Sequence, residues 1–268
     1  MKKLIILLLC LVSIVNADEY TIGKAKSATN PCLNLIQINA RQPASFYPNC
    51  TTWQTFKTDD GTNYFDLGPF NNSGIGTNLT KNPTWTNFGG GSIYLTRTSG
   101  KGISFGDVDW FLGNSMFTIS FWMYKQNNTS VQRLISKIRV NNEVLIQSNP
   151  DQLQVAIYQA NATPCTFLDT GIIALNTWTH VAMVFNLTGT TTTNQIALYT
   201  NGIQCVGTYG GSVLSSIQNT SEPLTFGCGD QDVGSEKSIE GYLDDMKVWT
   251  NTVLTSNQVL NLYLLGKQ

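Results

Sequence analysis

The feature that most constrains the fold is a stretch of alternating side chains from Trp178 to Gly202, with the sequence WTHVAMVFNLTGTTTTNQIALYTNG. Side-chain character changes at every second position over 178–186 and again over 196–200, which is the period of a half-buried β-strand. The stretch therefore predicts a hairpin in the middle of a sheet. Asn201 and Gly202 tolerate positive φ angles, so they predict a tight turn into a third strand over 203–209.

Other segments with the same two-residue period follow at short intervals, separated by Asn, Pro or Gly. They predict strands over 92–95, 117–124, 133–137, 143–147, 153–159, 166–170 and 242–249. The chain has 268 residues and 41% hydrophobic content, which suffices for one large core. We therefore expect an all-β chain in which two antiparallel sheets pack face to face. Phe121, Val184 and Leu198 are expected to point into the core between them.

The C-terminal part predicts an irregular strand followed by a short helix. Leu243 and Met246 are both apolar although they lie three residues apart, so a β-bulge at Asp244-Asp245 would bring both into the core. The sequence from Thr255 to Gln258 fits a capping box at the start of a helix. The buried face of this helix and its glycine terminator are expected at Val259, Leu262, Tyr263 and Gly266.

A series of short motifs runs through most of the chain. NNSGIGTNL, NPTW, FGGGSIYL and FTISFWMY come first, and WTHVAMVFN, LYTNG, PLTFGCGD and GYLDDMKVWTNTVLTSNQVLNLY follow. In this order they resemble the laminin-G-like, concanavalin A-like jelly-roll family, over about Phe56 to Leu265. The resemblance implies a two-sheet antiparallel jelly-roll sandwich with a short C-terminal helix.

The N-terminal segment is typical of a secretory signal. Lys2 and Lys3 precede an apolar run over 4–15, and Val15-Asn16-Ala17 precedes Asp18. The run is too short for a transmembrane helix, which needs about 20 apolar residues, and no later stretch is longer. We expect a signal peptide over 1–17, an N-terminal arm over 18–55 and a jelly-roll domain over 56–268. The arm contains a short alternating segment, LNLIQINA, which is either an edge strand of the same domain or an addition to a neighbouring molecule's sheet.

Extracellular modifications agree with secretion. N-glycan acceptor sequences begin at Asn49, Asn71, Asn78, Asn127, Asn128, Asn161, Asn186 and Asn219. Five cysteines remain after signal removal. We expect Cys32 to pair with Cys50 and two of Cys165, Cys205 and Cys228 to pair, leaving one thiol either buried or joined to a second chain.

Charged residues make up only 12% of the chain, with a net charge of −1 and no run of like charges. This balance argues against nucleic acid or an anionic membrane as the main partner. One loop, GCGDQDVGSEKSIE over 227–240, is dense in carboxylates. Carboxylate oxygens on a flexible turn suit Ca²⁺, which some members of the resembled family bind at loop ends. The candidate calcium ligands are Asp230, Asp232 and Glu236, against the alternative of a solvated loop.

Two aromatic residues beside loops, Trp110 and Tyr209, are candidate ligand contacts, because exposed rings stack on sugars or anchor protein partners. They could equally close the ends of the core. A hydrolase is not expected. Glucanases of the resembled superfamily carry carboxylates at alternate positions of one strand, whereas here Glu240 and Asp244 lack a third partner. His180, the only histidine, has no nucleophile signature and is expected in the core, bonded to a backbone group.

These features together predict a secreted, non-catalytic glycoprotein that binds extracellular glycan or protein. The alternative from another class is a structural subunit of a coat or filament, in which the N-terminal arm docks on the next copy. No cofactor is expected other than the possible Ca²⁺.

Overall fold

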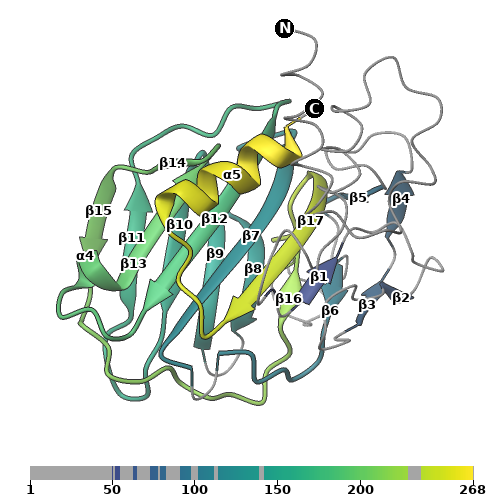
Figure 1. Ribbon diagram of the computed structural model, residues 1–268. Coiled ribbons are helices and arrows are strands. Elements are labelled where there is room, and N and C mark those ends of the chain that lie inside the picture. The colour runs from purple at the N-terminus through teal and green to yellow at the C-terminus, as the bar shows by residue number, and fades with distance from the viewer. Residues whose placement is uncertain are drawn as a thin grey trace, which may run out of the picture. The chain divides into compact units, whose positions relative to one another are not determined.

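The alternating segments pair into two antiparallel sheets that lie face to face (Figure 1). The computed structural model describes residues 50, 52–54, 63–64, 73–77, 79–82, 91–97, 102–111, 114–138, 142–228 and 237–267. All of them belong to one unit, Asn49–Gln268. The predicted two-sheet jelly-roll class is confirmed.

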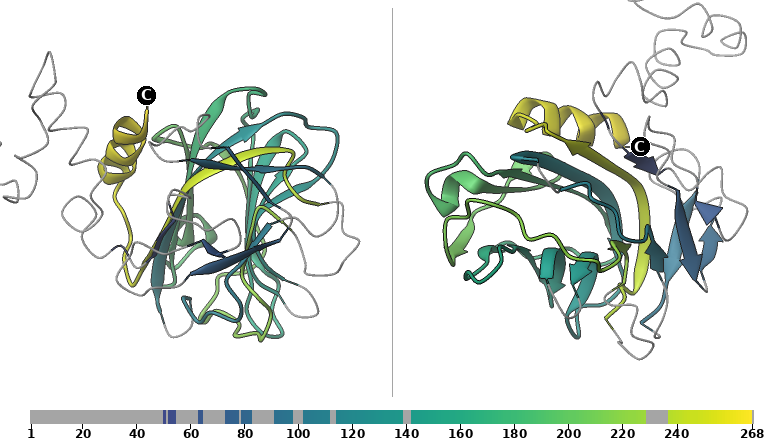
Figure 2. Two further views of the ribbon diagram at one scale, coloured as in Figure 1. Left: turned by 90° about the vertical axis from the view of Figure 1, so that its right-hand side faces the viewer. Right: turned by 90° about the horizontal axis from the view of Figure 1, so that it is seen from below.

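One sheet carries helix α5 (Ser256–Gly266) on its outer face and is called here the α5 sheet (Figure 2). Its described strands run in the order β14 (Ile203–Gln204), β13 (Ile196–Thr200), β12 (Trp178–Asn186), β7 (Met116–Lys125), β17 (Gly241–Thr250), β5 (Ser92–Leu95) and β4 (Thr80–Asn82). A further strand, β1 (Thr52–Gln54), pairs with the second half of β17. Residues that the sequence placed in the N-terminal arm therefore contribute to this sheet.

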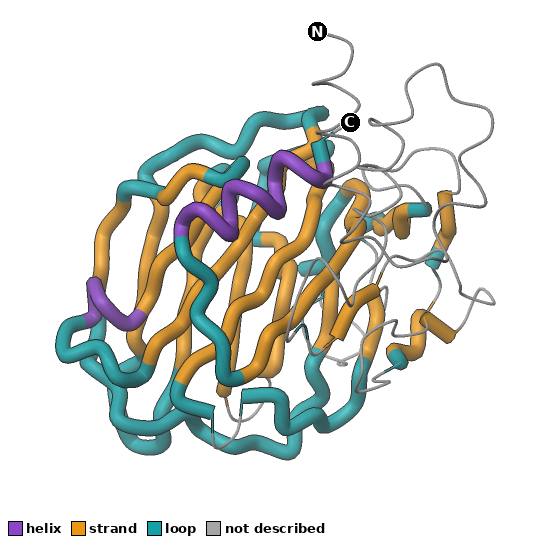
Figure 3. Tube along the Cα trace, viewed as in Figure 1, coloured by secondary structure: helices purple, strands orange, loops and turns teal. Residues whose placement is uncertain are grey.

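The second sheet packs against the inner face of the first and is called the opposite sheet (Figure 3). Its described strands are β15 (Gly207–Gly210), β11 (Cys165–Asp169), β10 (Gln152–Ile157), β9 (Asn142–Asn149), β8 (Gln132–Ile138), β16 (Thr225–Phe226), β6 (Gly102–Ser104), β3 (Gly74–Thr77) and β2 (Asn63–Tyr64), in that spatial order.

The predicted hairpin is the pair β12–β13, with Val181 opposite Thr200 and Phe185 opposite Ile196. Its connection contains a short helix, α4 (Thr192–Gln195), that the sequence analysis did not anticipate. Asn201 and Gly202 have φ angles of 50° and 78°, as a tight turn with two positive φ residues requires.

The predicted single strand over 203–209 is wrong, because the chain changes sheets within it. The first part, β14, pairs with β13, whereas β15 pairs with β11 of the opposite sheet. Cys205 still donates its backbone N–H to Leu198, but the next residue, Val206, accepts from Thr170. The edge of the sandwich is therefore closed by one continuous segment.

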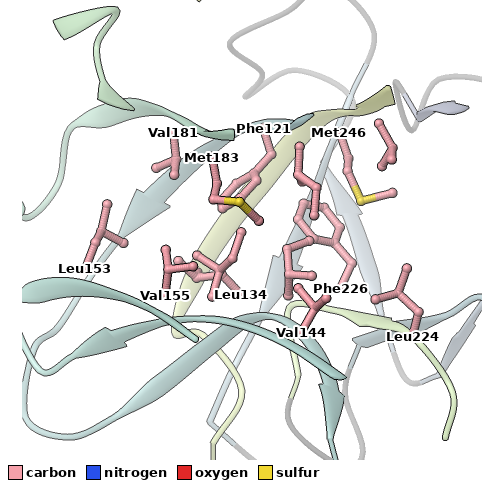
Figure 4. Close-up of a cluster of buried hydrophobic side chains, with 14 of the residues drawn as sticks. Phe121, Leu134, Val144, Leu153, Val155, Val181, Met183, Leu224, Phe226 and Met246 are labelled. Carbon is pink, nitrogen blue, oxygen red and sulfur yellow. The ribbon is translucent and has the colours of Figure 1, made fainter. Parts of the chain in front are cut away.

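Side chains from both sheets interdigitate in the core (Figure 4). Phe121, Met183 and Met246 come from the α5 sheet, and Val144 and Val155 come from the opposite sheet. Each of these side chains is fully buried. At roughly 25 cal/mol per Å² of apolar surface, burial of such residues is the main stabilising contribution to the fold.

Phe121 and Leu198 face this core as predicted, but Val184 does not. Met183 and Phe185 belong to the core cluster, and because side chains alternate along a strand, Val184 lies on the outer face of the α5 sheet. It is nevertheless buried there. Both faces of β12 are apolar in part, so the period alone could not identify the inner one.

The predicted bulge in β17 is confirmed. The pairing of β17 with β7 shifts between Asp244 and Lys247, and Asp245 has a φ angle of 53°. The extra residue reverses the alternation, so that Leu243 and Met246 are both fully buried in the core.

Helix α5 (Ser256–Gly266) lies across the outer face of the α5 sheet (Figure 2). Its predicted capping box is present, with Thr255 and Gln258 each bonding to the backbone of the other. Gly266 differs from the prediction: it lies inside the helix, and a Cβ atom there would come 2.5 Å from Nε1 of Trp122. This glycine allows close approach of the helix to the sheet and does not adopt a left-handed cap. No helix in the described part of the chain is long and apolar enough to cross a membrane.

The cysteine pairing expected among Cys165, Cys205 and Cys228 is wrong, since Cys165 and Cys205 are both free thiols. Cys165 lies on β11 and Cys228 follows β16, with three strands between them in the sheet. Strands are about 4.8 Å apart, which places these residues well beyond the reach of a disulfide. Burial raises the pKa of Cys165 to about 11 and that of Cys205 to about 12. Cys32 lies outside the described residues, so the Cys32–Cys50 pair stays a prediction.

Candidate functional site

A groove of about 310 Å³ opens on the outer face of the α5 sheet, beside the start of α5. One wall is the β12–β13 hairpin with α4, and the other is the segment that leads from β17 into α5. Figure 1 shows this segment passing in front of the sheet before the helix begins. The lining residues are Val184, Asn186, Thr193, Asn194, Gln195, Ile196, Ala197, Tyr199, Val253, Leu254, Thr255 and Ser256.

The alternation of the hairpin explains which side chains reach the groove. Val184 and Ala197 form a cross-strand pair on the outer face of the sheet. Asn186 lies two residues beyond Val184 at the end of β12, on the same face. Tyr199, two residues beyond Ala197, places its hydroxyl 3.2 Å from Oγ of Ser256 at the start of α5. This contact ties the floor of the groove to its far wall.

The groove offers uncharged hydrogen-bonding groups. Oδ1 of Asn186 accepts from the backbone N–H of Thr188 at 3.0 Å and from its hydroxyl at 2.7 Å. Within the described residues, Nδ2 of Asn186 and the side chain of exposed Asn194 have no hydrogen-bond partner. Carboxamides both donate and accept, as a ligand rich in hydroxyl groups requires. None of the lining residues is charged.

The family sequence model described as the concanavalin A-like lectin/glucanases superfamily matches residues 96–260, which is more than half of the chain. The chain belongs to this superfamily. A search of curated protein sequences found no match.

Solved structures show the same fold in other members. The binding domain of Paraclostridial mosquitocidal protein 1 is 16% identical with a TM-score of 0.62, over 81% of this chain and 52% of that one. The ligand-binding domain of botulinum neurotoxin serotype D, solved with N-acetylneuraminic acid, is 16% identical with a TM-score of 0.61, over 81% and 50%. The chain thus spans about half the length of these toxin structures.

A neighbour that is matched over almost its whole length is domain 4 of AbnA, an extracellular arabinanase from Geobacillus stearothermophilus, solved with arabinotriose. It is 15% identical with a TM-score of 0.58, over 80% of this chain and 98% of that one. At such low identity the likeness establishes the fold alone.

Within this superfamily fold, the two predicted aromatic contacts pack against different neighbours. Trp110 is only 6% exposed, and its ring centroid lies 5.2 Å from that of Phe105, so it closes one end of the core. Tyr209 is half-buried on β15, an edge strand of the opposite sheet, with its ring 4.8 Å from Phe167. Burial raises the pKa of Tyr209. The structure does not bring these two rings into one site, and neither lines the groove.

The predicted calcium ligands Asp230, Asp232 and Glu236 lie outside the described residues, and calcium binding stays a prediction. No group of three or more metal-ligating side chains occurs in the part of the chain that the structure describes. Glu240, at the end of the same acidic loop, accepts a hydrogen bond from Nδ2 of Asn127. This carboxylate therefore stabilises the loop between β7 and β8.

The single histidine is buried, but it lies on the outer face of the α5 sheet and not in the core that was predicted, and its partner is a side chain and not the backbone. Nε2 of His180 lies 2.8 Å from Oγ of Ser120, beneath α5. Asp244 is likewise fully buried, on the strand that pairs with β7. These groups do not face the groove, so they add no acid–base pair to it.

The sequence analysis did not identify a row of aromatic side chains across the α5 sheet. The row consists of four half-buried residues that are direct cross-strand partners on neighbouring strands: Trp178 on β12, Tyr124 on β7, Tyr242 on β17 and Tyr94 on β5. Their ring centroids are 5.7, 5.9 and 4.8 Å apart in this order. Cross-strand aromatic pairs of this kind stabilise the sheet. Only the strand register, which the sequence does not show, reveals the row.

The sequence analysis also missed the groove. Asn186 was considered only as a glycan acceptor, and the 253–256 segment only as the approach to a helix. Among the other acceptor sites, Asn161 and Asn219 are exposed in loops, and Asn127 and Asn128 are partly exposed between β7 and β8. The remaining ones, Asn49, Asn71 and Asn78, lie outside the described residues.

Proposed function

We propose that this protein is a non-catalytic, secreted binding protein that holds a neutral oligosaccharide in the groove between the β12–β13 hairpin and the start of α5. The observation that carries the proposal is the lining: Nδ2 of Asn186 and the carboxamide of Asn194, which have no partner among the described residues, lie beside hydroxyl groups and apolar side chains. Sugar rings present hydroxyl groups at their edges and C–H groups on their faces. A wall of mixed amide and apolar groups complements both.

The absence of charge from the lining distinguishes between classes of sugar. An anionic sugar such as the N-acetylneuraminic acid held by the botulinum neurotoxin D domain favours a cationic partner, which the lining lacks. Arabinotriose, held by the arabinanase domain, is uncharged. Neutral oligosaccharides are therefore the class that this groove fits.

The size of the groove suits a bound oligosaccharide, and its lining does not suit hydrolysis of one. Ligand sites commonly enclose about 300–1,000 Å³, so a groove of 310 Å³ fits one or two sugar rings. Hydrolysis of a glycosidic bond needs two carboxyl groups about 5–10 Å apart. The residues lining the groove include no carboxylate.

The proposal is tested on an array of neutral and sialylated oligosaccharides with the mature chain. We expect binding to neutral members, and a loss of about tenfold in affinity on Asn194→Ala, as removal of one or two hydrogen bonds predicts. Gln204→Ala, which removes an exposed carboxamide from β14, is the matched control and should bind as the wild type does. Binding that survives Asn194→Ala unchanged, or is confined to sialylated glycans, would refute the groove as a neutral-sugar site.

A second candidate function is assembly into an extracellular coat or filament through the N-terminal arm. It is favoured by exposed apolar residues where the chain changes sheets: Ile203 is 71% exposed and Val206 is 78% exposed. Ile203 belongs to β14, an edge strand to which an extended segment could add. Sedimentation with and without residues 18–49, a deletion that leaves β1 in place, decides between the two functions, since a monomer in both cases excludes assembly by this route.

A further inference from the structure

Asn186 combines two properties in one residue. It lines the groove, and it begins the acceptor sequence Asn186-Leu187-Thr188. We propose that N-glycosylation of Asn186 and occupation of the groove are mutually exclusive, so that a glycan on this residue masks the chain's own binding site. The masking of a ligand rests on the proposed function, whereas the blocking of the groove does not.

The carboxamide of Asn186 is held in a defined position by its own acceptor sequence. Its Oδ1 accepts both the backbone N–H and the hydroxyl of Thr188, at 3.0 and 2.7 Å. Gly189 donates its N–H to the carbonyl of Asn186 at 3.1 Å, which closes a turn directly after β12. Turns of this kind fix the carboxamide at the surface, where a modifying enzyme can reach it.

The nitrogen that would carry the glycan is free to do so. Nδ2 of Asn186 has no hydrogen-bond partner among the described residues, and the side chain is partly exposed. Asn127 is different, because its Nδ2 donates to the carboxylate of Glu240 and that bond would have to change geometry on modification. Asn161 and Asn219 are exposed, but they do not line the groove.

The position of Nδ2 explains why the two states exclude each other. Asn186 is part of the groove wall, so the first sugar attached to its Nδ2 begins beside the groove. It displaces any ligand from the neighbouring volume of about 310 Å³. Glycosylation also replaces one of the two Nδ2 hydrogens, which removes a donor that a bound oligosaccharide would use.

The test uses the mature chain secreted by a eukaryotic host that N-glycosylates proteins. Thr188→Ala abolishes the acceptor sequence and leaves Asn186 and the backbone N–H of residue 188 in place, while Thr188→Ser retains the acceptor sequence. Thr188 does not line the groove. Glycopeptide mass spectrometry measures occupancy at Asn186. Protein from a bacterial host without N-glycosylation shows whether Thr188→Ala has any effect of its own.

Groove access is measured with a thiol probe that requires no ligand. Thr193 is exposed in the groove, and Thr193→Cys should react with a maleimide more than about tenfold more slowly when Asn186 is glycosylated than in the Thr188→Ala background, since only the open fraction reacts. Thr208→Cys, exposed on β15, is the control and should react equally in both. Peptide mapping separates these adducts from those of the native cysteines.

The outcomes separate this inference from the proposed function. An unmodified Asn186 in the secreted protein, or equal labelling of the Thr193→Cys variant with and without the glycan, overturns the inference. Slow labelling in the glycosylated form with fast labelling in Thr188→Ala supports it. If Thr188→Ala then binds neutral oligosaccharides on the array and the glycosylated protein does not, ligand masking is established as well. If the open form binds none of them, the proposed function fails while the blocking of the groove holds.

Discussion

Nε2 of His180 lies 2.8 Å from Oγ of Ser120, in the layer between the α5 sheet and helix α5. The imidazole is 1% exposed and lies 5.1 Å from the ring of Trp122. Burial, with a smaller contribution from the charge of Lys247, lowers the pKa of His180 to about 3. The histidine is therefore neutral in the folded protein at ordinary pH, and the pair joins β7 to β12 on the face that α5 covers.

The first prediction is a dependence of stability on acid that His180 causes. Its pKa is 6.5 in the unfolded chain and about 3 in the folded one, so below pH 6.5 the unfolded state binds the extra proton. The free energy of unfolding should therefore fall as the pH is lowered from about 6.5 to about 3. This residue contributes up to about 1.4 kcal/mol per pH unit. Denaturant titrations at several pH values measure the slope. His180→Gln should flatten it, and an unchanged slope in that variant would exclude His180 as the cause.

The second prediction concerns the contact of α5 with the sheet. Alanine is a better helix former than glycine by about 1 kcal/mol, so helix propensity alone predicts that Gly266→Ala stabilises the protein. A Cβ at this position would lie 2.5 Å from Nε1 of buried Trp122, which predicts the opposite. We expect a net loss of about 1–3 kcal/mol, measured by denaturant unfolding. Leu264→Ala, at an exposed position of the same helix, is the control, and a stabilised Gly266→Ala would contradict the close contact.

The sequence predicted the strands well, because their cause is local. Where one face of a strand is wholly apolar, as at Phe121, alternation identifies both the strand and its inner side. The bulge at Asp244-Asp245 was predictable for the same reason, because one extra residue in a strand restores an interrupted two-residue period. The inner side of β12 was not, because Val184 on the outer face is as apolar as Val181 on the inner one. The change of sheets after Cys205 has no local signal either.

The groove could not be predicted from the sequence, because distant segments form it. Asn186 and Asn194 flank a loop, but their opposite wall comes from 253–256, more than fifty residues further on. That wall is placed by the packing of α5, which depends on Gly266 against Trp122. Of the aromatic residues singled out in the sequence, Trp110 lies in the connection between β6 and β7, whereas Tyr209 lies on β15, an edge strand of the opposite sheet. Residue type alone did not distinguish a ring that packs from a ring that binds.

The third prediction concerns a buried ion pair at the bulge of β17. Nζ of Lys247 donates to the carboxylate of Asp245, and both side chains are almost fully buried. Asp245→Asn keeps a residue that tolerates the positive φ angle but removes the negative charge facing Lys247. We expect a loss of about 3–5 kcal/mol in the free energy of unfolding. The double variant Asp245→Asn with Lys247→Met should recover most of this loss. If it does not, the charge of Lys247 is not the reason for the cost.

The last prediction separates binding in the groove from stability of the fold. Ala197 is half-buried on the outer face of β13, opposite Val184, and its methyl group lines the groove. Ala197→Phe should fill much of the volume without entering the core, because the inner face of β13 is formed by Ile196 and Leu198. Binding to neutral oligosaccharides should fall by more than about tenfold, which corresponds to about 1.4 kcal/mol. The control variant is Thr208→Phe, which adds a phenyl ring on β15, outside the groove, and should bind neutral oligosaccharides as the wild type does.

Calorimetry should show a melting temperature within a few degrees of the wild type for both variants. Surface substitutions of this kind usually change the free energy of unfolding by no more than about 0.5 kcal/mol. Equal binding by Ala197→Phe and the wild type would place the ligand elsewhere on the molecule.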